Sequence, residues 1–159
     1  MMHGLSSDCA IRRAELSDLQ ALLPLVAAYR AFYGQTPDAT KERAFLEQRL
    51  RDGTSAVYLA VTNSGAAGFV QIFETYSTVY LGPSLILEDL FVYPEQRGRG
   101  IATALLDRAL THAREAGAFG MFLETAMNNT AAQRVYERAG WTREGRFYKY
   151  NAPALGARV

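Results

Sequence analysis

The stretch Leu85–Ala102 reads LILEDLFVYPEQRGRGIA and decides how this 159-residue chain folds. Its first part is a nearly continuous apolar run, interrupted by Glu88 and Asp89, which predicts a buried strand that ends at Pro94. A short turn rich in glycine and arginine follows, and then a helix expected over about residues 101–116. Strand, turn and helix succeed one another without spare residues, which is typical of an α/β protein.

The turn in this stretch has the composition of a phosphate site. The first N–H groups of a helix have no intrahelical partner and lie at the positive end of the helix dipole, so they attract anions. Gly98 and Gly100 allow the backbone to approach a ligand closely, and Arg97 and Arg99 supply positive charge. The alternative is that the two glycines make a tight turn and nothing more.

Two nucleotide-binding motifs fit this turn poorly. The pattern Gly98-x-Gly100-x-x-Thr103 has threonine where the dinucleotide fingerprint needs glycine or alanine, and no ribose-binding acid follows in a βαβ unit. The Gly-Lys-Ser/Thr of a P-loop is absent from the sequence.

The rest of the chain predicts elements on both sides of this segment. A helix is expected to open at Ser17 with a capping box to Gln20, and a late helix at Thr130 with a capping box to Gln133. The order β-α-α-β-β-β-α-β-α-β-β predicts a single-domain mixed α/β fold with a mostly antiparallel central sheet flanked by helices. The domain spans residues 1–159, with a core over about 10–151 and flexible ends. The expected strands are 10–14, 56–61, 67–76, 85–93, 119–125, 141–142 and 147–151, and the expected helices are 17–33, 39–51, 101–116 and 130–139.

Composition narrows the function classes. The net charge of +1 gives no reason to expect a nucleic acid or a membrane surface as partner. A single cysteine, Cys9, excludes an intramolecular disulfide and a cysteine-based zinc site, and no metal site is expected. The first residues lack the charged and apolar regions of a signal peptide, so a cytoplasmic enzyme is the expectation.

Three segments resemble the GNAT superfamily of N-acetyltransferases. Arg97–Ala102 matches its Arg-x-x-Gly-x-Ala signature, Leu87–Pro94 is similar to its central strand, and Asn129–Trp141 is similar to its second block. The expected element order agrees with that of the superfamily over almost the whole chain. The resemblance implies that the protein binds acetyl-coenzyme A. The residues that it assigns to the coenzyme are Leu90, Phe91, Val92, Arg97, Gly98, Arg99, Gly100, Ile101, Ala102, Thr103, Asn129, Ala132 and Tyr136.

Within this resemblance the turn wraps the pyrophosphate of the coenzyme, and backbone groups of Leu90 and Val92 bind the pantetheine arm. Asn129 has a second reading, because asparagine is also a favoured helix N-cap. Tyr136 lies beside the coenzyme sulfur in the resemblance, and a phenol with a pKa of about 10 can protonate a departing thiolate. The alternative for Tyr136 is a core tyrosine, since it shares a helical face with Ala132 and Val135.

The acceptor amine attacks a thioester only when it is neutral, so a base is useful. Glu88 is the candidate base or amine-binding residue, because an acid inside an apolar strand is costly unless it is paired or functional. A structural ion pair is its alternative role. Neighbouring residues of a regular strand point to opposite faces, so Glu88 and Asp89 are not expected to face one pocket.

The acceptor site is expected near the first two helices and the loop around residues 76–84. Tyr29, Tyr33 and Tyr80, with Glu88 and Asp89, are the candidate acceptor residues, and the run from Tyr29 to Gly34 resembles the diamine-acetyltransferase branch. The favoured function is acetyl transfer to a primary amine of a small molecule, polyamine- or amino-acid-like. The alternatives are protein or peptide N-acetylation and a non-catalytic module that binds acyl-coenzyme A. A homodimer joined through the last two expected strands is also predicted.

Overall fold

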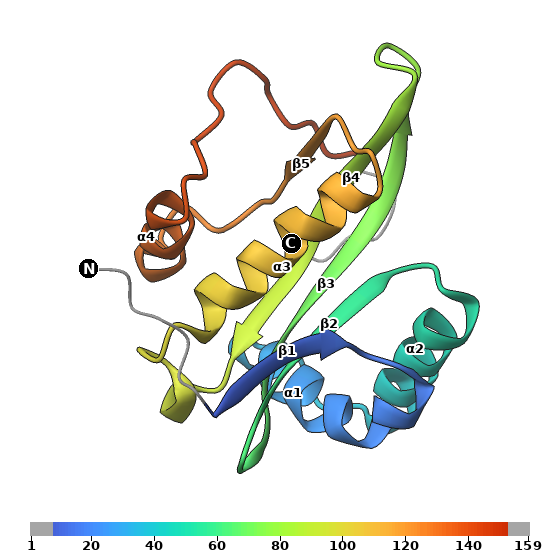
Figure 1. Ribbon diagram of the computed structural model, residues 1–159, viewed down its shortest axis with the longest axis vertical. Coiled ribbons are helices and arrows are strands. Elements are labelled where there is room, and N and C mark those ends of the chain that lie inside the picture. Colours follow the sequence, from blue (N-terminus) through green and yellow to red (C-terminus); the bar gives the residue numbers. More distant parts are fainter. Residues whose placement is uncertain (1–7, 153–159) are drawn as a thin grey trace.

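The computed structural model describes residues 8–152, and its elements follow the predicted order as far as the last helix. Figure 1 shows a twisted sheet with helices on both faces. Two single-turn 3-10 helices, η1 (Leu16–Asp18) and η2 (Pro94–Gln96), accompany the regular elements. The regular elements are β1 (Cys9–Arg13), α1 (Leu19–Phe32), α2 (Ala39–Asp52), β2 (Ala56–Thr62), β3 (Gly65–Ser77), β4 (Gly82–Val92), α3 (Ile101–Glu115), β5 (Gly120–Phe122) and α4 (Thr130–Arg138).

The sheet has the strand order β1-β2-β3-β4-β5. The first four strands pair antiparallel, and β4 pairs with β5 in parallel, with α3 as the crossover between them. The predicted mixed, mostly antiparallel sheet is therefore confirmed. It places β4, the strand that decides the fold, between the long β3 and the short β5.

Two apolar clusters cover the two faces of the sheet. On one face, Leu22 and Leu25 of α1 and Leu46 of α2 pack against Leu59 and Phe69. The opposite face holds a second cluster, to which α3 contributes Ile101, Leu105, Leu106, Ala109 and Ala113. Alternate residues of β2 enter the two clusters, because successive side chains of a strand point to opposite faces. The sheet thus separates an α1/α2 side from an α3 side.

The two predicted capping boxes are wrong in their residues. At the start of the first helix the carboxylate of Asp18 accepts from the N–H of Glu15 at 2.8 Å, and α1 itself begins at Leu19. At α4 the side chain of Asn129 caps the helix by accepting from the N–H of Ala132 at 3.2 Å. Asparagine caps at least as well as threonine, so Asn129 takes the N-cap position at α4, whereas Asp18 acts as the third residue of a capping box that begins at Glu15.

The last two expected strands, Trp141–Thr142 and Phe147–Asn151, do not form. Residues 141–152 carry neither strand nor helix, and the expected strand over 119–125 is reduced to Gly120–Phe122. A strand exists only when it is paired, and Phe147, Tyr148 and Tyr150 are exposed, so no burial fixes this segment against β5. Of the expected flexible ends outside residues 10–151, residues 1–7 and 153–159 are not among the described residues, and Cys9 belongs to β1.

Candidate active site

A β-bulge in β4 shapes the candidate active site. Gln71 of β3 pairs with Asp89, but the next residue of β3, Ile72, pairs with Leu87, so Glu88 is an extra residue in β4. Leu87 and Leu90 consequently both pack on the α3 side of the sheet. The residues between them, Glu88 and Asp89, are left for the α1 side. The expectation that the two carboxylates face apart holds for a regular strand and is overturned by the bulge.

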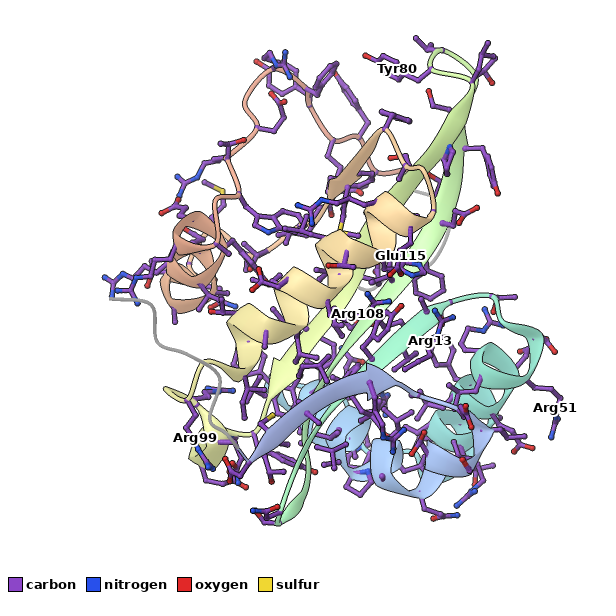
Figure 2. The ribbon with its side chains drawn as sticks, viewed as in Figure 1. Arg13, Arg51, Tyr80, Arg99, Arg108 and Glu115 are labelled. Atoms are coloured by element: carbon purple, nitrogen blue, oxygen red, sulfur yellow. The ribbon has the colours of Figure 1, made fainter. Side chains whose placement is uncertain are left out.

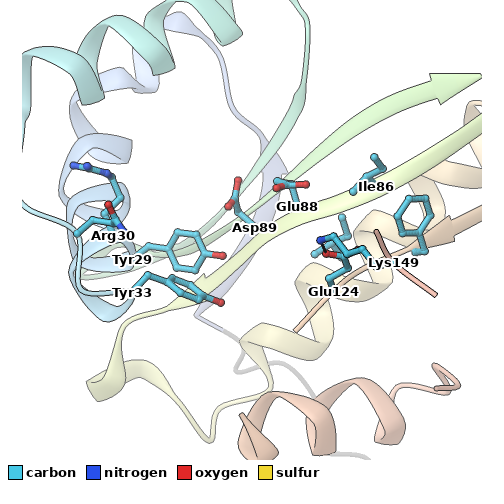
Figure 3. A pocket seen from close by; sticks show the side chains of 11 residues that line it. Tyr29, Arg30, Tyr33, Ile86, Glu88, Asp89, Glu124 and Lys149 are labelled. Atoms are coloured by element: carbon cyan, nitrogen blue, oxygen red, sulfur yellow. Dashed lines mark hydrogen bonds and ion pairs between the residues drawn. The ribbon is translucent and has the colours of Figure 1, made fainter. Parts of the chain in front are cut away.

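Both carboxylates line one cavity of about 540 Å³ on the α1 side (Figure 3). One wall comes from the end of α1, and the opposite wall comes from β5 and the segment after α4. The lining residues are Tyr29, Arg30, Tyr33, Gln35, Ile86, Leu87, Glu88, Asp89, Phe122, Glu124 and Lys149.

The two carboxylates differ in their surroundings. Asp89 Oδ2 accepts a hydrogen bond from Gln71 Nε2 at 2.7 Å, and Gln71 is almost fully buried. Burial raises the pKa of Asp89 and the charge of Glu88 raises it further, while the amide of Gln71 and the hydroxyl of Tyr29 act in the opposite direction. Glu88 is exposed, and within residues 8–152 its carboxylate has no hydrogen-bond or ion-pair partner.

Two of the three predicted acceptor tyrosines reach this cavity. The rings of Tyr29 and Tyr33 meet edge to face with centroids 5.1 Å apart, and Tyr29 also contacts the rings of Phe69 and Phe91. Burial and the nearby charge of Asp89 raise the pKa of Tyr29. Tyr80 lies instead at the far tip of the β3–β4 hairpin, where it stacks on Phe119 at 4.4 Å (Figure 2). The structure does not bring Tyr80 to the cavity.

Tyr136, the predicted acid, lies on α4 near Trp141, with ring centroids 6.4 Å apart. Burial raises the pKa of its phenol, and the phenol of Tyr33 adds to the effect. The hydroxyl is therefore protonated at neutral pH and lies within electrostatic range of the tyrosines at the end of α1. Tyr136 is not among the residues that line the acceptor cavity.

The predicted anion turn has the expected backbone. Gly98 and Gly100 adopt φ values of +74° and +78°, in the left-handed region that favours glycine. The N–H of Ala104 donates to the carbonyl of Gly100 at 3.0 Å, so the amides of residues 101–103 precede the first intrahelical bond. This stretch of backbone presents N–H groups at the start of α3, as an anion site requires.

The two arginines of the turn are bound by the chain itself. Arg97 Nε donates to the carbonyl of Val92 at 3.0 Å. Arg99 donates to Gln96 Oε1 at 2.6 Å and forms an ion pair with Asp8 at 3.1 Å. An anion at this turn would therefore meet the backbone amides first, with the charge of the two arginines nearby. The residues present fit a pyrophosphate.

The edge of β4 that faces β5 is open between the cavity and the turn. The parallel pairing of β4 with β5 covers Ser84–Ile86 and Gly120–Phe122. Beyond β5 the chain turns away from β4 toward α4 (Figure 1). The predicted pantetheine ligands, Leu90 and Val92, lie in the part of β4 that this pairing does not reach. An extended ligand can add to such an edge as a strand does.

Several polar residues at the site were not predicted from sequence. Gln71 and Ser55 lie behind Asp89, Arg30 is paired with Glu42, and Lys149 is paired with Glu124 on the wall opposite α1. A glutamine inside the buried strand β3 is the one signal that the sequence offers for Gln71. Lys149 belongs to a segment far along the chain, and no local pattern connects it with β4.

Within the described residues there is no group of three histidine, cysteine, aspartate or glutamate side chains arranged to hold a metal ion. None of the helices in that part of the chain has the length and apolar character of a membrane span.

Comparison with known proteins identifies the family. The model of the acetyltransferase (GNAT) family matches residues 22–141. The uncharacterized N-acetyltransferase YhfO of Bacillus subtilis is 38% identical over 146 residues, covering 91% of this chain and 98% of its own. The crystal structure of a probable acetyltransferase superposes with a TM-score of 0.87 at 36% identity, covering 93% of this chain and 99% of its own.

A more distant structure shares the fold alone. An aminoglycoside acetyltransferase from an uncultured soil metagenomic sample superposes with a TM-score of 0.80 at 17% identity, covering 96% of this chain and all of its own. The match to the family model, residues 22–141, includes the glycine turn, the bulged strand β4 and α4. The chain therefore belongs to the acetyltransferase (GNAT) family and is an acyl-coenzyme A-dependent N-acetyltransferase.

Proposed function

We propose that this protein transfers an acetyl group from acetyl-coenzyme A directly to a primary amine of a small molecule, polyamine- or amino-acid-like. The observation that carries the proposal is the bulge, which turns Glu88 and Asp89 into one cavity beside the open edge of β4. A cavity with two adjacent carboxylates and an aromatic wall favours a cationic aliphatic ligand.

The residues assigned to the coenzyme by resemblance form a continuous path in this proposal. The amides around Gly98, Gly100 and Ile101 hold the pyrophosphate, and the exposed edge at Leu90 and Val92 holds the pantetheine arm. Bound acetyl-coenzyme A supplies a thioester carbonyl that an uncharged amine attacks, with a thiolate as leaving group.

The chain supplies proton transfer at both ends of this reaction. On the acceptor side, the carboxylates of Glu88 and Asp89 attract the ammonium and receive its proton, so that the amine becomes a nucleophile. On the coenzyme side, the protonated phenol of Tyr136 donates to the departing sulfur. The raised pKa of Tyr136 keeps this proton in place at neutral pH.

Two alternative functions stay open to experiment. Protein or peptide N-acetylation requires room for a polypeptide, whereas a cavity of about 540 Å³ between α1 and β5 suits a small acceptor. A non-catalytic acyl-coenzyme A module needs neither the carboxylate pair nor Tyr136.

The test is release of free thiol from acetyl-coenzyme A in the presence of pooled amines: polyamines, amino acids, aminoglycosides and a lysine-rich peptide. We expect one small-amine pool to exceed the rate with acetyl-coenzyme A alone. Activity confined to the peptide pool would establish the protein alternative, and silence in every pool with intact coenzyme binding would establish the binding module.

The Tyr136→Phe variant then tests the acid. Turnover should fall by about 100-fold or more because the leaving thiolate loses its proton donor, while affinity for coenzyme A, measured by calorimetry, stays unchanged. Tyr148→Phe is the matched control, since Tyr148 is exposed outside the cavity. Undiminished turnover in Tyr136→Phe would refute the assignment.

A cytoplasmic location and a homodimer stay predictions from sequence. The lone cysteine supports a reducing compartment. The dimer contact was expected on the last two strands, which do not form, so size-exclusion chromatography with light scattering must decide the oligomeric state.

A further inference from the structure

Three polar side chains form a line that runs from the buried sheet into the acceptor cavity. Ser55 Oγ donates to Gln71 Oε1 at 2.8 Å, and Gln71 Nε2 donates to Asp89 Oδ2 at 2.7 Å. Ser55 is 7% exposed and Gln71 is 4% exposed. Each step joins a donor to an acceptor, and the line ends on a carboxylate that lines the cavity.

The Asp89 carboxylate fixes the direction of the Gln71 amide, because an ionised carboxylate only accepts hydrogen bonds. Ser55, whose hydroxyl can donate or accept, donates to Oε1, and Gln71 presents an N–H of Nε2 to the carboxylate. This donor is uncharged. It orients the carboxylate and favours its ionised form, but it does not neutralise it as an arginine would. Gln71 donates to Oδ2, and the same carboxylate lines the cavity.

A purely structural role does not explain this arrangement well. Burying an amide and a hydroxyl is costly unless both are hydrogen-bonded, and an apolar side chain at position 71 would join the neighbouring cluster around Phe69 without that cost. The buried pair Ser55 and Gln71 is explained if Asp89 has to keep one orientation and remain ionisable in a buried position.

Glu88 has none of these constraints. It is exposed and has no partner among the described residues, so its side chain is free to change rotamer. A mobile exposed carboxylate is suited to attract a cation, and a fixed buried one is suited to take a proton from a defined atom.

We propose that Asp89 is the residue that takes the proton of the acceptor ammonium, and that Gln71, hydrogen-bonded to Ser55 on its other side, is the positioning residue that holds Asp89 for this step. The inference rests on the proposed acetyl transfer. An N–H bond of the ammonium breaks and an O–H bond forms on Asp89, giving a neutral amine and a neutral carboxylic acid. The carboxylic acid returns its proton to water after transfer.

The groups that face Asp89 determine the direction in which its pKa should move when Gln71 is replaced. Glu88 lies next to it on β4, the hydroxyl of Tyr29 faces it from α1, and the amide of Gln71 faces it from β3. Gln71 favours the charged form. Removing its N–H therefore raises the pKa of Asp89, and the acidic limb of kcat/KM for the amine moves to higher pH.

The experiment compares Gln71→Leu with the unmodified protein. We expect the acidic limb to move up by about one pH unit, because a hydrogen bond to a charged group is lost. Ser55→Ala should give a smaller shift in the same direction, and it serves as the second variant if Gln71→Leu fails to fold. Gln48→Leu, the same substitution at an exposed position of α2, should leave the limb in place.

A measurement without turnover separates this inference from the proposed function. Carbon-13 NMR of labelled aspartate side chains follows the titration of Asp89, identified by its loss in Asp89→Asn. A titration that moves up in Gln71→Leu supports the positioning role even if no amine is acetylated, in which case the proposed function alone fails. An unmoved titration overturns the inference.

Replacing each carboxylate by its amide distinguishes the roles of Glu88 and Asp89. Asp89→Asn should lower kcat by about 100-fold or more because the proton acceptor is gone, whereas Glu88→Gln should act mainly on KM for the amine. The reverse outcome, with kcat retained in Asp89→Asn and lost in Glu88→Gln, would overturn the assignment of the base to Asp89.

Discussion

Two polar cavities of similar size lie on opposite sides of the sheet in the described part of the chain, and they differ in how their charges are matched. The acceptor cavity, on the α1 side, contains Glu88, which has no partner within residues 8–152, and Asp89, which is held by an uncharged amide. The second cavity, of about 590 Å³, lies on the α3 side against β1 and β2, and we refer to it as the Tyr58 cavity. Its residues are Ile11, Arg12, Arg13, Tyr58, Arg108, His112, Glu115 and Ala116.

The side chains around Tyr58 in this cavity form hydrogen bonds and an ion pair with one another. The hydroxyl oxygen of Tyr58 accepts from Arg108 at 3.0 Å and from Arg13 at 3.4 Å, so its proton is left for His112 Nδ1 at 3.0 Å. Arg108 and Arg13 also lie over the Tyr58 ring, and Arg108 forms an ion pair with Glu115 at 2.8 Å (Figure 2).

The comparison shows which polar clusters call for a ligand. Arg13, Arg108, His112 and Glu115 surround the buried phenol of Tyr58 as the residues of a binding site would. Their side-chain hydrogen bonds, however, go to Tyr58 or to one another. In the acceptor cavity Glu88 and Asp89 converge, and within residues 8–152 neither carboxylate forms an ion pair with a cation. Unmatched charge at a concave surface, rather than the number of polar residues, distinguishes the candidate active site.

Removing one hydroxyl from each cavity should therefore have opposite consequences. Tyr58→Phe should lower the free energy of unfolding by about 1–3 kcal/mol, because two guanidinium groups and His112 lose a shared partner, and should leave kcat/KM unchanged. Urea denaturation and steady-state kinetics measure the two quantities.

Tyr29→Phe is the counterpart in the acceptor cavity. It should lower kcat/KM for the amine by about tenfold, since the Tyr29 hydroxyl favours ionised Asp89, and should change the free energy of unfolding much less than Tyr58→Phe does. If Tyr58→Phe cost activity and Tyr29→Phe cost stability, the distinction between the two cavities would be wrong.

The contrast also shows what the sequence was able to predict. The strand, turn and helix around residues 85–102 follow from local pattern, because an apolar run, a proline and two glycines act through the backbone near them. The glycine turn was predicted for that reason, and its two glycines adopt the left-handed conformation that glycine tolerates. The four helices and the first strands follow in the same way from apolar periodicity and turn residues.

The bulge depends on pairing between strands, so alternation within β4 did not reveal it. The sequence does carry one sign of the bulge. The apolar residues Leu85, Leu87, Leu90 and Val92 are two positions apart except between Leu87 and Leu90, where the two acids make the interval three. Gln71 acquires its role through register with Asp89, and register between distant segments is not encoded in a local pattern. The failure of the closing strands has the same origin, since aromatic residues over 147–151 favour a strand but nothing pairs with it.

A smaller effect is expected from salt, which should weaken the binding of a cationic amine in the acceptor cavity. Raising sodium chloride from about 0.05 M to about 0.5 M should raise KM for a cationic amine several-fold at saturating acetyl-coenzyme A, because the exposed charge of Glu88 becomes screened. Glu88→Gln should abolish most of this dependence. A KM that rises equally in both proteins would mean that Glu88 does not attract the acceptor.

The smallest expected effect is the pH dependence of stability that His112 gives to the Tyr58 cavity. Burial lowers the pKa of His112, and the charges of Arg13 and Arg108 lower it further. The unfolded chain therefore binds a proton at His112 at higher pH than the folded protein does. Its contribution to stability is complete above pH 6.5 and is lost as the pH falls through the folded value. Thermal unfolding at pH 7.5 and pH 5.5 should show a drop in Tm that is reduced in His112→Gln. An equal drop in both proteins would show that other groups control acid sensitivity and that protonated His112 is accommodated beside its two arginines.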